Sequence, residues 1–263
     1  MDNNFRIGVL ISGSGTNLQA IIDSCEKGKI KGKLAFVGSD NPNAKGLDRA
    51  RRHKIPTFVV DYSSIIKRFK RKTAKALLPD DYNFDDLLSK QALLLENTDS
   101  KKTETFIMTR AIAERELLDK MKPYPFDLLI LAGFMRNLTP YFIDRVNTDP
   151  DHRCIMNIHP ALLPAFPGTD GYGDTFQYGC KVGGCTVHFI DYGEDTGPII
   201  GQKAFQIEKD DTLDTIKKRG LALEWELYPE CINLFAKNRL KTIKVPYILK
   251  NGEERERTVV KIL

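Results

Sequence analysis

The stretch FRIGVLISGSGTNLQAIIDSC, residues 5–25, changes its hydrophobic period in the middle, and the fold can be predicted outward from that change. Phe5 to Ile11 is predicted to be an apolar, buried strand. Leu18, Ile21 and Ile22 recur at helical spacing, so a helix is expected over residues 18–25. The small residues 12–17 form the loop between the two elements.

This loop is a candidate anion site. Without bulky Cβ atoms, the N–H groups of the first helical turn can face an anion, and the helix dipole favours negative charge there. We therefore expect a phosphate. A dinucleotide site is the alternative, since Asp40 follows the second strand where a ribose-binding acid would lie, but Leu18 replaces the third glycine of that fingerprint. A monophosphate fits the loop better than a pyrophosphate.

Further along the chain, strands and helices alternate. Strands are predicted near residues 33–38, 57–60, 126–132 and 154–158, with helices between them. Such alternation predicts an α/β fold with a doubly wound, mostly parallel sheet, helices on both faces and ligands at the carboxyl ends of the strands.

Asn157 and His159 lie at one of these carboxyl ends. Residues two apart in a strand project from the same face, so the two side chains emerge side by side while Ile158 points into the core. Pro160 disfavours the helical region for His159 and holds it extended. An amide and an imidazole aimed at one point can both donate hydrogen bonds to an oxygen that gains negative charge. A histidine with a purely structural role is the alternative interpretation of this pair.

Asp195 is the candidate partner of this histidine. It lies in a turn-forming stretch, residues 192–198, between strand-like runs at 185–190 and 198–205. A carboxylate beside His159 would raise the pKa of the imidazole and make it a general acid or a cationic oxyanion stabiliser near neutral pH. The alternative is an aspartate that caps its own turn.

The bulk composition predicts one folded domain over residues 1–263. Of the 263 residues, 41% are hydrophobic and 9% aromatic, which is typical of a globular protein. No apolar run is long enough to cross a bilayer, and residues 1–4 lead straight into the first strand, so neither a membrane partner nor a cleavable signal is expected. We predict a cytoplasmic protein.

Cysteine usage and charge narrow the chemistry. The five cysteines form no C-x-x-C pair and are odd in number, which predicts reduced thiols and no metal site. The net charge of +5 suits anionic small molecules as well as it suits nucleic acid.

Two segments lie outside this alternating pattern. Segment 63–109 contains a basic stretch at residues 67–75 and then apolar positions at helical spacing, namely Phe84, Leu87, Leu88, Leu94 and Leu95 together with Gln91. No recognised nucleic-acid-binding motif accompanies the charges, so we interpret the segment as a helical excursion that binds no nucleic acid and serves as a homodimer surface or as a cover beside Arg110. Residues 240–263 alternate around Lys250-Asn251-Gly252, which predicts a C-terminal β-hairpin packed near the sheet edge.

Four separated motifs together resemble one known family. They are IGVLISGSGTNLQAII (7–22), DLLILAGFMRNLTP (127–140), IMNIHPALLPAFPG (155–168) and TVHFIDYGEDTGPII (186–200). In this order they resemble the phosphoribosylglycinamide formyltransferases, which use folate to formylate glycinamide ribonucleotide in purine synthesis. The resemblance covers residues 5–62 and 110–240, and it implies a Rossmann-like formyltransferase fold.

The resemblance also implies roles for individual residues. Gly15, Thr16 and Asn17 match the loop that holds the substrate phosphate, and Glu224 matches a carboxylate on the ribose side. Asn157, His159 and Asp195 match the catalytic positions, where the amide and the imidazole stabilise the oxyanion and relay the proton while the aspartate supports the charged imidazole.

The co-substrate implied by the resemblance is 10-formyltetrahydrofolate, with no metal. The residues that match its binding site are Arg110, Met135, Arg136, Asn137, Leu138, Asn157, Asp191, Tyr192, Gly193, Glu194 and Asp195.

Some positions depart from the family pattern. Leu221 stands where a glutamine is usual, and residues 169–184 are richer in glycine and poorer in histidine than the loop expected over the site. Because of these departures, a non-catalytic nucleotide-binding module remains an alternative to the formyl transfer that the resemblance implies.

Two enzyme alternatives share the core. One is 10-formyltetrahydrofolate deformylase, a hydrolase that carries an additional domain before the first strand. The other is methionyl-tRNA formyltransferase, which needs a larger C-terminal domain than the residues after Lys237 supply.

Overall fold

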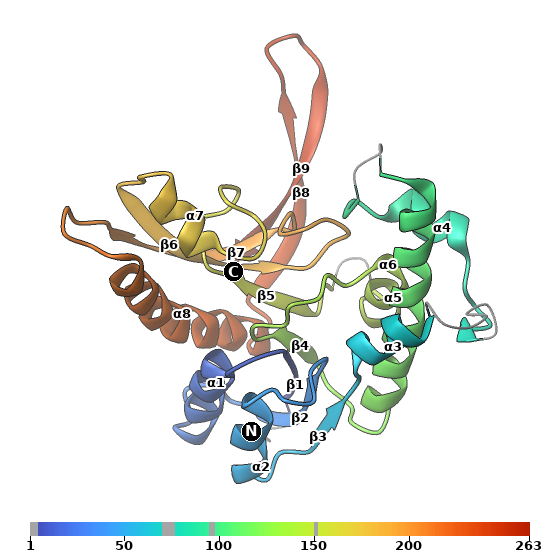
Figure 1. Cartoon of the computed structure of the whole chain (residues 1–263). Coiled ribbons are helices and arrows are strands. Elements are labelled where there is room, and N and C mark those ends of the chain that lie inside the picture. The colour runs from blue at the N-terminus through green and yellow to red at the C-terminus, as the bar shows by residue number, and fades with distance from the viewer. Residues whose placement is uncertain (1–4, 70–76, 95–97, 150–151) are drawn as a thin grey trace.

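A computed structural model describes residues 5–69, 77–94, 98–149 and 152–263 of the chain, and a seven-stranded sheet lies at its centre (Figure 1). The strand order is β3-β2-β1-β4-β5-β6-β7. The strands are β1 (Arg6–Ile11), β2 (Lys33–Ser39), β3 (Thr57–Val59), β4 (Leu128–Leu131), β5 (Ile155–His159), β6 (Val182–Phe189) and β7 (Ile199–Gln206). The helices are α1 (Thr16–Glu26), α2 (Gly46–Arg52), α3 (Tyr62–Phe69), α4 (Phe84–Lys90), α5 (Ser100–Met121), α6 (Pro140–Val146), α7 (Gly171–Gln177) and α8 (Leu213–Ala236).

The sheet is mostly parallel, as the alternation of strands and helices predicted. Strands β3, β2, β1, β4 and β5 run parallel, and β6 and β7 continue the sheet in antiparallel fashion. In the β5–β6 pair, Asn157 lies opposite His188 and His159 lies opposite Thr186. This register places the expected site at the boundary between the parallel and antiparallel parts.

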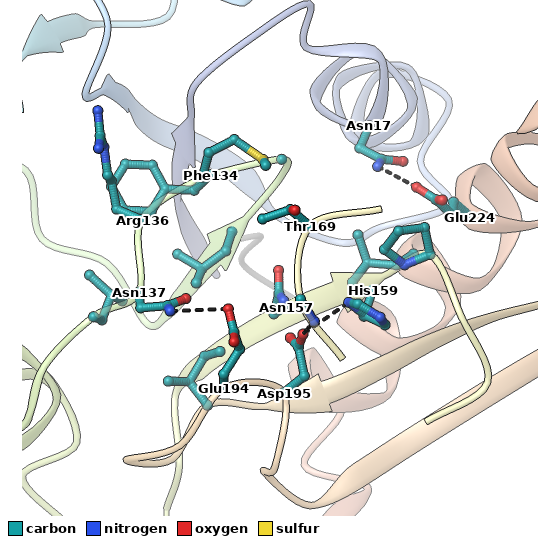
Figure 2. Close-up of a pocket in the computed structure, with 18 of the residues that line it drawn as sticks. Asn17, Phe134, Arg136, Asn137, Asn157, His159, Thr169, Glu194, Asp195 and Glu224 are labelled. Atoms are coloured by element: carbon teal, nitrogen blue, oxygen red, sulfur yellow. Dashed lines mark hydrogen bonds and ion pairs between the residues drawn. The ribbon is translucent and has the colours of Figure 1, made fainter. Parts of the chain in front are cut away.

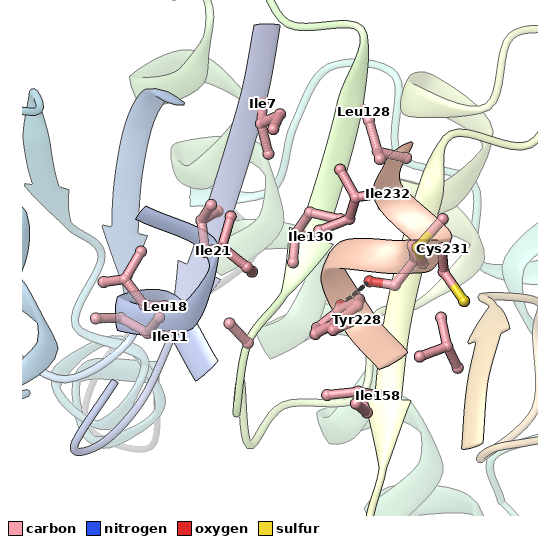
Figure 3. Packing of buried hydrophobic residues seen from close by; sticks show 14 of the residues in the cluster. Ile7, Ile11, Leu18, Ile21, Leu128, Ile130, Ile158, Tyr228, Cys231 and Ile232 are labelled. Atoms are coloured by element: carbon pink, nitrogen blue, oxygen red, sulfur yellow. Dashed lines mark hydrogen bonds between the residues drawn. The ribbon is translucent and has the colours of Figure 1, made fainter. Parts of the chain in front are cut away.

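Helices cover both faces of the sheet, so the doubly wound prediction is confirmed. On one face, apolar side chains of α1 and α8 pack on β1, β4 and β5, including Ile21 and Tyr228 (Figure 3). On the other face, α5 and α6 pack on the same strands through Ala113, Leu117 and Phe142. Because the central strands are buried on both sides, they read as continuous apolar runs.

The turn from β1 into α1 is tight because it packs on a second glycine. Gly15 caps α1 with φ 69°, in the left-handed region that favours glycine. A Cβ at Gly15 would lie 2.7 Å from the Cα of Gly46. The loop that was expected to hold an anion is therefore closed on one side by the start of α2.

Within its described residues, segment 63–109 contains three separate α-helical stretches. It includes most of α3, all of α4 and the first half of α5, and its boundary at 109 falls inside α5. The expected helix was wrong beyond Lys90: the Gln91 backbone is extended, and its side-chain oxygen accepts hydrogen bonds from the N–H groups of Leu93 and Leu94. Such local bonds compete with the helix. Leu95 and the basic residues 70–75 lie outside the described residues.

The C-terminal hairpin is confirmed. β8 (Leu240–Ile248) and β9 (Glu254–Ile262) pair along their whole length as a separate two-stranded sheet. The base of the hairpin contacts β7, the edge strand of the main sheet, and the remainder projects away from the sheet (Figure 1). Among the described helices, none combines the length and the apolarity that crossing a bilayer requires.

Tyr228 ties α8 to the two strands below the site, which gives a prediction for stability. Its hydroxyl is buried and shares its hydrogen between the carbonyl oxygens of Leu131, at 3.1 Å, and Met156, at 2.8 Å. Tyr228→Phe should lower the free energy of unfolding by about 1–2 kcal/mol, because two buried acceptors lose their donor. Urea denaturation measures the loss. Tyr178→Phe, at a position 82% exposed, is the control, and equal effects of the two substitutions would contradict this account.

Candidate active site

A cavity of about 340 Å³ lies at the carboxyl ends of β4 and β5, where ligands were expected. Figure 2 shows Asn157, His159 and Asp195 in its middle, Asn17 and Glu224 on one side, and Arg136, Asn137 and Glu194 on the other. We call the side with Asn17 and Glu224 the acceptor side and the side with Arg136, Asn137 and Glu194 the donor side, after the formyl acceptor and the formyl donor that the sequence resemblance implies for them. The cavity is therefore built from segments that lie up to 207 residues apart in the sequence.

His159 and Asp195 meet in this cavity, as the sequence predicted. Nδ1 of His159 lies 3.1 Å from Oδ2 of Asp195, and both side chains are almost fully buried. The N–H of Gly168 donates to the same carboxylate oxygen at 2.9 Å. Asp195 adopts φ 55°, a left-handed conformation that Asp tolerates better than most residues. The alternative of an aspartate that only caps its own turn does not fit these contacts.

The pair shifts the pKa of both partners. Burial alone would lower the pKa of His159, but the hydrogen bond and the charge of Asp195 outweigh burial, so the pKa is raised above its usual value. Burial alone would raise the pKa of Asp195, but the hydrogen bonds from His159 and Gly168, together with the charge of His159, hold it well below its usual range. The arrangement favours an imidazolium beside a carboxylate.

The other ring nitrogen of His159 is also engaged. Nε2 lies 2.7 Å from the backbone carbonyl oxygen of Phe166. Both partners of the ring are acceptors, so both nitrogens donate when the ring is protonated. A reactant oxygen that takes a proton or a hydrogen bond from Nε2 must therefore replace the Phe166 carbonyl.

His188 is a site residue that the sequence analysis missed. Its Nε2 lies 3.3 Å from Nδ2 of Asn157 and 3.5 Å from Oδ1 of Asp195, and its Nδ1 lies 2.9 Å from the carbonyl oxygen of Phe189. When Nδ1 donates to that carbonyl, Nε2 of a neutral ring accepts from the Asn157 amide and orients it. In the pairing of β5 with β6, His188 lies opposite Asn157. Only this register relates the two residues, and the sequence alone does not reveal it.

The acceptor side contains a buried hydrogen-bonded carboxylate. Glu224 accepts from Nδ2 of Asn17 and from the hydroxyl of Tyr172, both at 2.7 Å. Burial raises the pKa of Glu224, although these bonds and the charge of His159 oppose the shift. Asn17 lines the cavity, whereas Gly15 and Thr16 are not among its lining residues. Leu221, which departs from the family pattern, also lines this side.

Two cations near the acceptor side were not predicted. Arg49 on α2 donates through Nε to the carbonyl oxygen of Ser14, in the loop before α1, at 2.9 Å. Lys217 on α8 lines the cavity, and its Nζ lies 3.3 Å from Asp170. Both could balance a phosphate charge near this loop. Asp40, by contrast, is buried against Arg136 at 2.6 Å, so it is not free to bind a ribose as the dinucleotide alternative required.

The donor side is formed by two segments that face each other across the cavity. Met135, Arg136, Asn137 and Leu138 line one wall, and Asp191, Gly193, Glu194 and Asp195 line the other. Nδ2 of Asn137 donates to Glu194 at 3.1 Å and joins the two walls (Figure 2). The Met135 N–H donates to the hydroxyl of Ser12, in the loop before α1, at 2.8 Å.

Two residues expected at the folate site do not line the cavity. The Arg110 guanidinium is buried over the rings of Tyr62 and Phe106, and its Nε and Nη1 have no hydrogen-bond partner among the described residues. Tyr192 points away from the cavity and donates to Asp144 at 2.5 Å. Their assignment to folate stays a prediction.

Residues 169–184, expected as a loop over the site, contain α7 and the first strand residues of β6. Thr169 and Tyr172 of this segment line the cavity. All five cysteines are free. Over the residues that the structure describes, no group of three or more His, Cys, Asp or Glu side chains could hold a metal ion.

The comparisons with known proteins agree with the fold. The family described as Formyl transferase matches residues 5–232, and the chain belongs to this family. The phosphoribosylglycinamide formyltransferase of Bacillus subtilis (strain 168) is 33% identical over 86% of this chain and 92% of its own length. That of Escherichia coli (strain K12) is 34% identical over 90% of this chain and 89% of its own length.

A solved structure extends the similarity to the whole chain. The crystal structure of glycinamide ribonucleotide transformylase 1 from Symbiobacterium toebii is 35% identical, covers 100% of this chain and 96% of its own, and superposes with a TM-score of 0.70. The resemblance inferred from the four motifs is thus confirmed.

Asp195→Asn should lower the pKa of His159, because burial is then opposed only by the smaller effects of the Phe166 carbonyl and the Glu224 charge. Histidine NMR titration measures the shift. A raised histidine pKa stabilises the fold below the unfolded value of about 6.5, and this contribution is lost as pH rises through the folded pKa. The stability difference between wild type and variant should therefore be larger at pH 6 than at pH 9. Glu194→Gln, in the same loop, should leave the pKa of His159 in place, and an unchanged pKa in Asp195→Asn would refute the coupling.

The stability of the fold should also depend on pH through Glu114. This buried carboxyl on α5 accepts from the N–H of Thr139, before α6, at 2.8 Å, and burial raises its pKa to about 8. Its contribution to stability is present below its unfolded pKa of about 4.3 and is lost as pH rises through 8. Glu114→Gln keeps the neutral form, so thermal denaturation should show wild type losing stability relative to it between pH 5 and pH 9. Glu116→Gln, exposed on the same helix, is the control. If the stabilities of wild type and Glu114→Gln change with pH in parallel, the conclusion that Glu114 is protonated in the folded protein is wrong.

Proposed function

We propose that this chain transfers the formyl group of 10-formyltetrahydrofolate to the amine of N1-(5-phosphoribosyl)glycinamide. The observation that carries the proposal is the His159–Asp195 pair in the middle of one cavity, with Asn157 beside it. The reaction joins two substrates at one carbonyl-sized point, and this pair lies between the acceptor side and the donor side.

His159 supplies charge and a proton. With Asp195 as its partner, the imidazolium is stabilised near neutral pH, and its Nε2 can donate to the formyl oxygen as negative charge develops there. The attacking amine forms the new C–N bond, the bond from the formyl carbon to the folate nitrogen breaks, and the proton lost by the amine reaches that leaving nitrogen. His159 is the group suited to relay it.

Asn157 is the second hydrogen-bond donor to the formyl oxygen. One N–H of its amide is directed to His188 and the other remains for the formyl oxygen. Because the amide is held before substrate binds, it needs little reorganisation during the reaction, which is the condition for strong electrostatic stabilisation.

The two sides of the cavity suit the two substrates. On the acceptor side, the N-terminus of α1 with Arg49 nearby suits the phosphate, and Glu224 suits ribose hydroxyls. On the donor side, the residues 135–138 and 191–195 suit the flat rings of the folate.

One assay tests the proposal against its alternatives. The purified chain is given 10-formyltetrahydrofolate with and without glycinamide ribonucleotide, and tetrahydrofolate release is followed. Release that requires the amine supports transfer. Release without it would identify a hydrolase, and no release in either case would leave a non-catalytic module.

Removal of either hydrogen-bond donor, His159 or Asn157, should slow the reaction without loss of the fold. His159→Ala and Asn157→Ala should each lower kcat by roughly 10²- to 10³-fold, since each deletes one preorganised donor. Steady-state kinetics with both substrates measure the effect. His152→Ala, at an exposed histidine, should turn over like wild type. Near-normal turnover of His159→Ala would remove His159 from the mechanism.

A further inference from the structure

The segment Gln91–Leu94 lies against the loop that carries Asp195. The N–H of Ala92 donates to the carbonyl oxygen of Tyr192 at 2.9 Å, and Ala92 forms an isolated parallel bridge with Gly193. This contact brings part of segment 63–109, for which the sequence motifs supplied no counterpart, to the donor side of the cavity.

The carboxylate of Asp144 binds both the segment and the loop. Asp144 on α6 receives Nζ of Lys90 at 3.0 Å and the hydroxyl of Tyr192 at 2.5 Å. Lys90 immediately precedes the segment and Tyr192 lies in the loop, so Asp144 holds the two together.

The segment also has an internal brace. The side-chain oxygen of Gln91 accepts from the N–H groups of Leu93 and Leu94, both at 2.9 Å. These two hydrogen bonds hold a turn in the chain directly after Ala92. The position of Leu93 is therefore determined by local bonds as well as by the bridge.

Leu93 reaches the cavity from this turn. Its side chain lines the wall together with Asn137, Gly193 and Glu194. The bridge between Ala92 and Gly193 assigns it to the donor side, opposite Asn17 and Glu224. An aliphatic side chain at this place suits a flat aromatic ring and offers nothing to a phosphate or a ribose.

We propose that Leu93 contacts the formyl donor and forms an apolar wall of its binding site, held there by the pairing of Ala92 with the Asp191–Asp195 loop. This inference rests on the proposed function and names a donor-binding residue outside the four sequence motifs.

The first test is Leu93→Ala. Loss of an apolar contact of about 1–2 kcal/mol should raise KM for 10-formyltetrahydrofolate by about five- to thirty-fold. KM for glycinamide ribonucleotide and kcat should stay within about twofold, which is a split that general destabilisation would not produce. Leu93→Met, which conserves volume, should restore most of the donor affinity.

Leu88→Ala is the matched control. Leu88 lies on α4 in the same segment and is 38% exposed, so its substitution should change neither KM. A donor KM within twofold of wild type in Leu93→Ala, or equal increases in both KM values, would overturn the proposal.

The pairing has its own test. Ala92→Pro removes the N–H that Tyr192 accepts, and the extended backbone of Gln91 suits a residue before proline. It should raise the donor KM, whereas Ala92→Gly retains the N–H and should not. Identical donor KM values for the two variants would show that the pairing does not hold the wall.

Failure of this inference is separable from failure of the proposed function. Calorimetric titration with tetrahydrofolate measures donor-site affinity without turnover, and Leu93→Ala should weaken it by the same factor as KM. A wild-type chain that binds tetrahydrofolate but transfers no formyl group would contradict the function and leave the Leu93 contact intact. Wild-type affinity in Leu93→Ala would contradict the contact alone.

Discussion

The ion pair between His159 and Asp195 is the interaction on which the site depends. It joins the end of the last parallel strand to a loop between the two antiparallel strands, so it closes the seam between the two parts of the sheet. Both side chains are buried, and an uncompensated charge there would be costly. Each partner keeps the other ionised, and the N–H of Gly168 supplies a further hydrogen bond to the carboxylate.

The rest of the cavity is arranged around that pair. Strand β5 supplies Asn157 and His159, helix α8 supplies Glu224, and the first turn of α1 closes the far end through Asn17. Helices α1 and α8 pack on one face of the sheet that contains β5, whereas the two donor-side walls are loops joined by the hydrogen bond from Asn137 to Glu194. Such a division suits a small polar acceptor held firmly and a larger, flatter donor held by adaptable surfaces.

The amino-acid sequence predicted the elements whose causes are local. The period change in residues 5–25 and the Asn-Gly turn at 251–252 predicted β1, α1 and the hairpin correctly, because strand burial and turn chemistry act over a few residues. The proximity of His159 and Asp195 could be predicted only from the family resemblance, because the two residues are 36 positions apart and no local sequence pattern relates them.

What the sequence could not predict depends on tertiary contacts. His188 reaches Asn157 only through the register of β5 with β6. Leu93 was expected inside or beside a helix, but Gln91 ends α4 early and the bridge to Gly193 turns the chain into the cavity. Arg110 matched a family position, yet packing over Tyr62 and Phe106 places it behind the wall.

The carbonyl of Phe166 on Nε2 of His159 has a consequence for selectivity between ground state and transition state. In the free protein the imidazole already donates to an uncharged amide oxygen. Exchange of that oxygen for the equally uncharged oxygen of a formyl group releases little free energy. As the oxygen of the reacting group becomes an anion, it turns into the stronger acceptor and the exchange becomes favourable. The backbone oxygen thus serves as an internal reference acceptor, and only a reactant that has begun to change its charge outcompetes it.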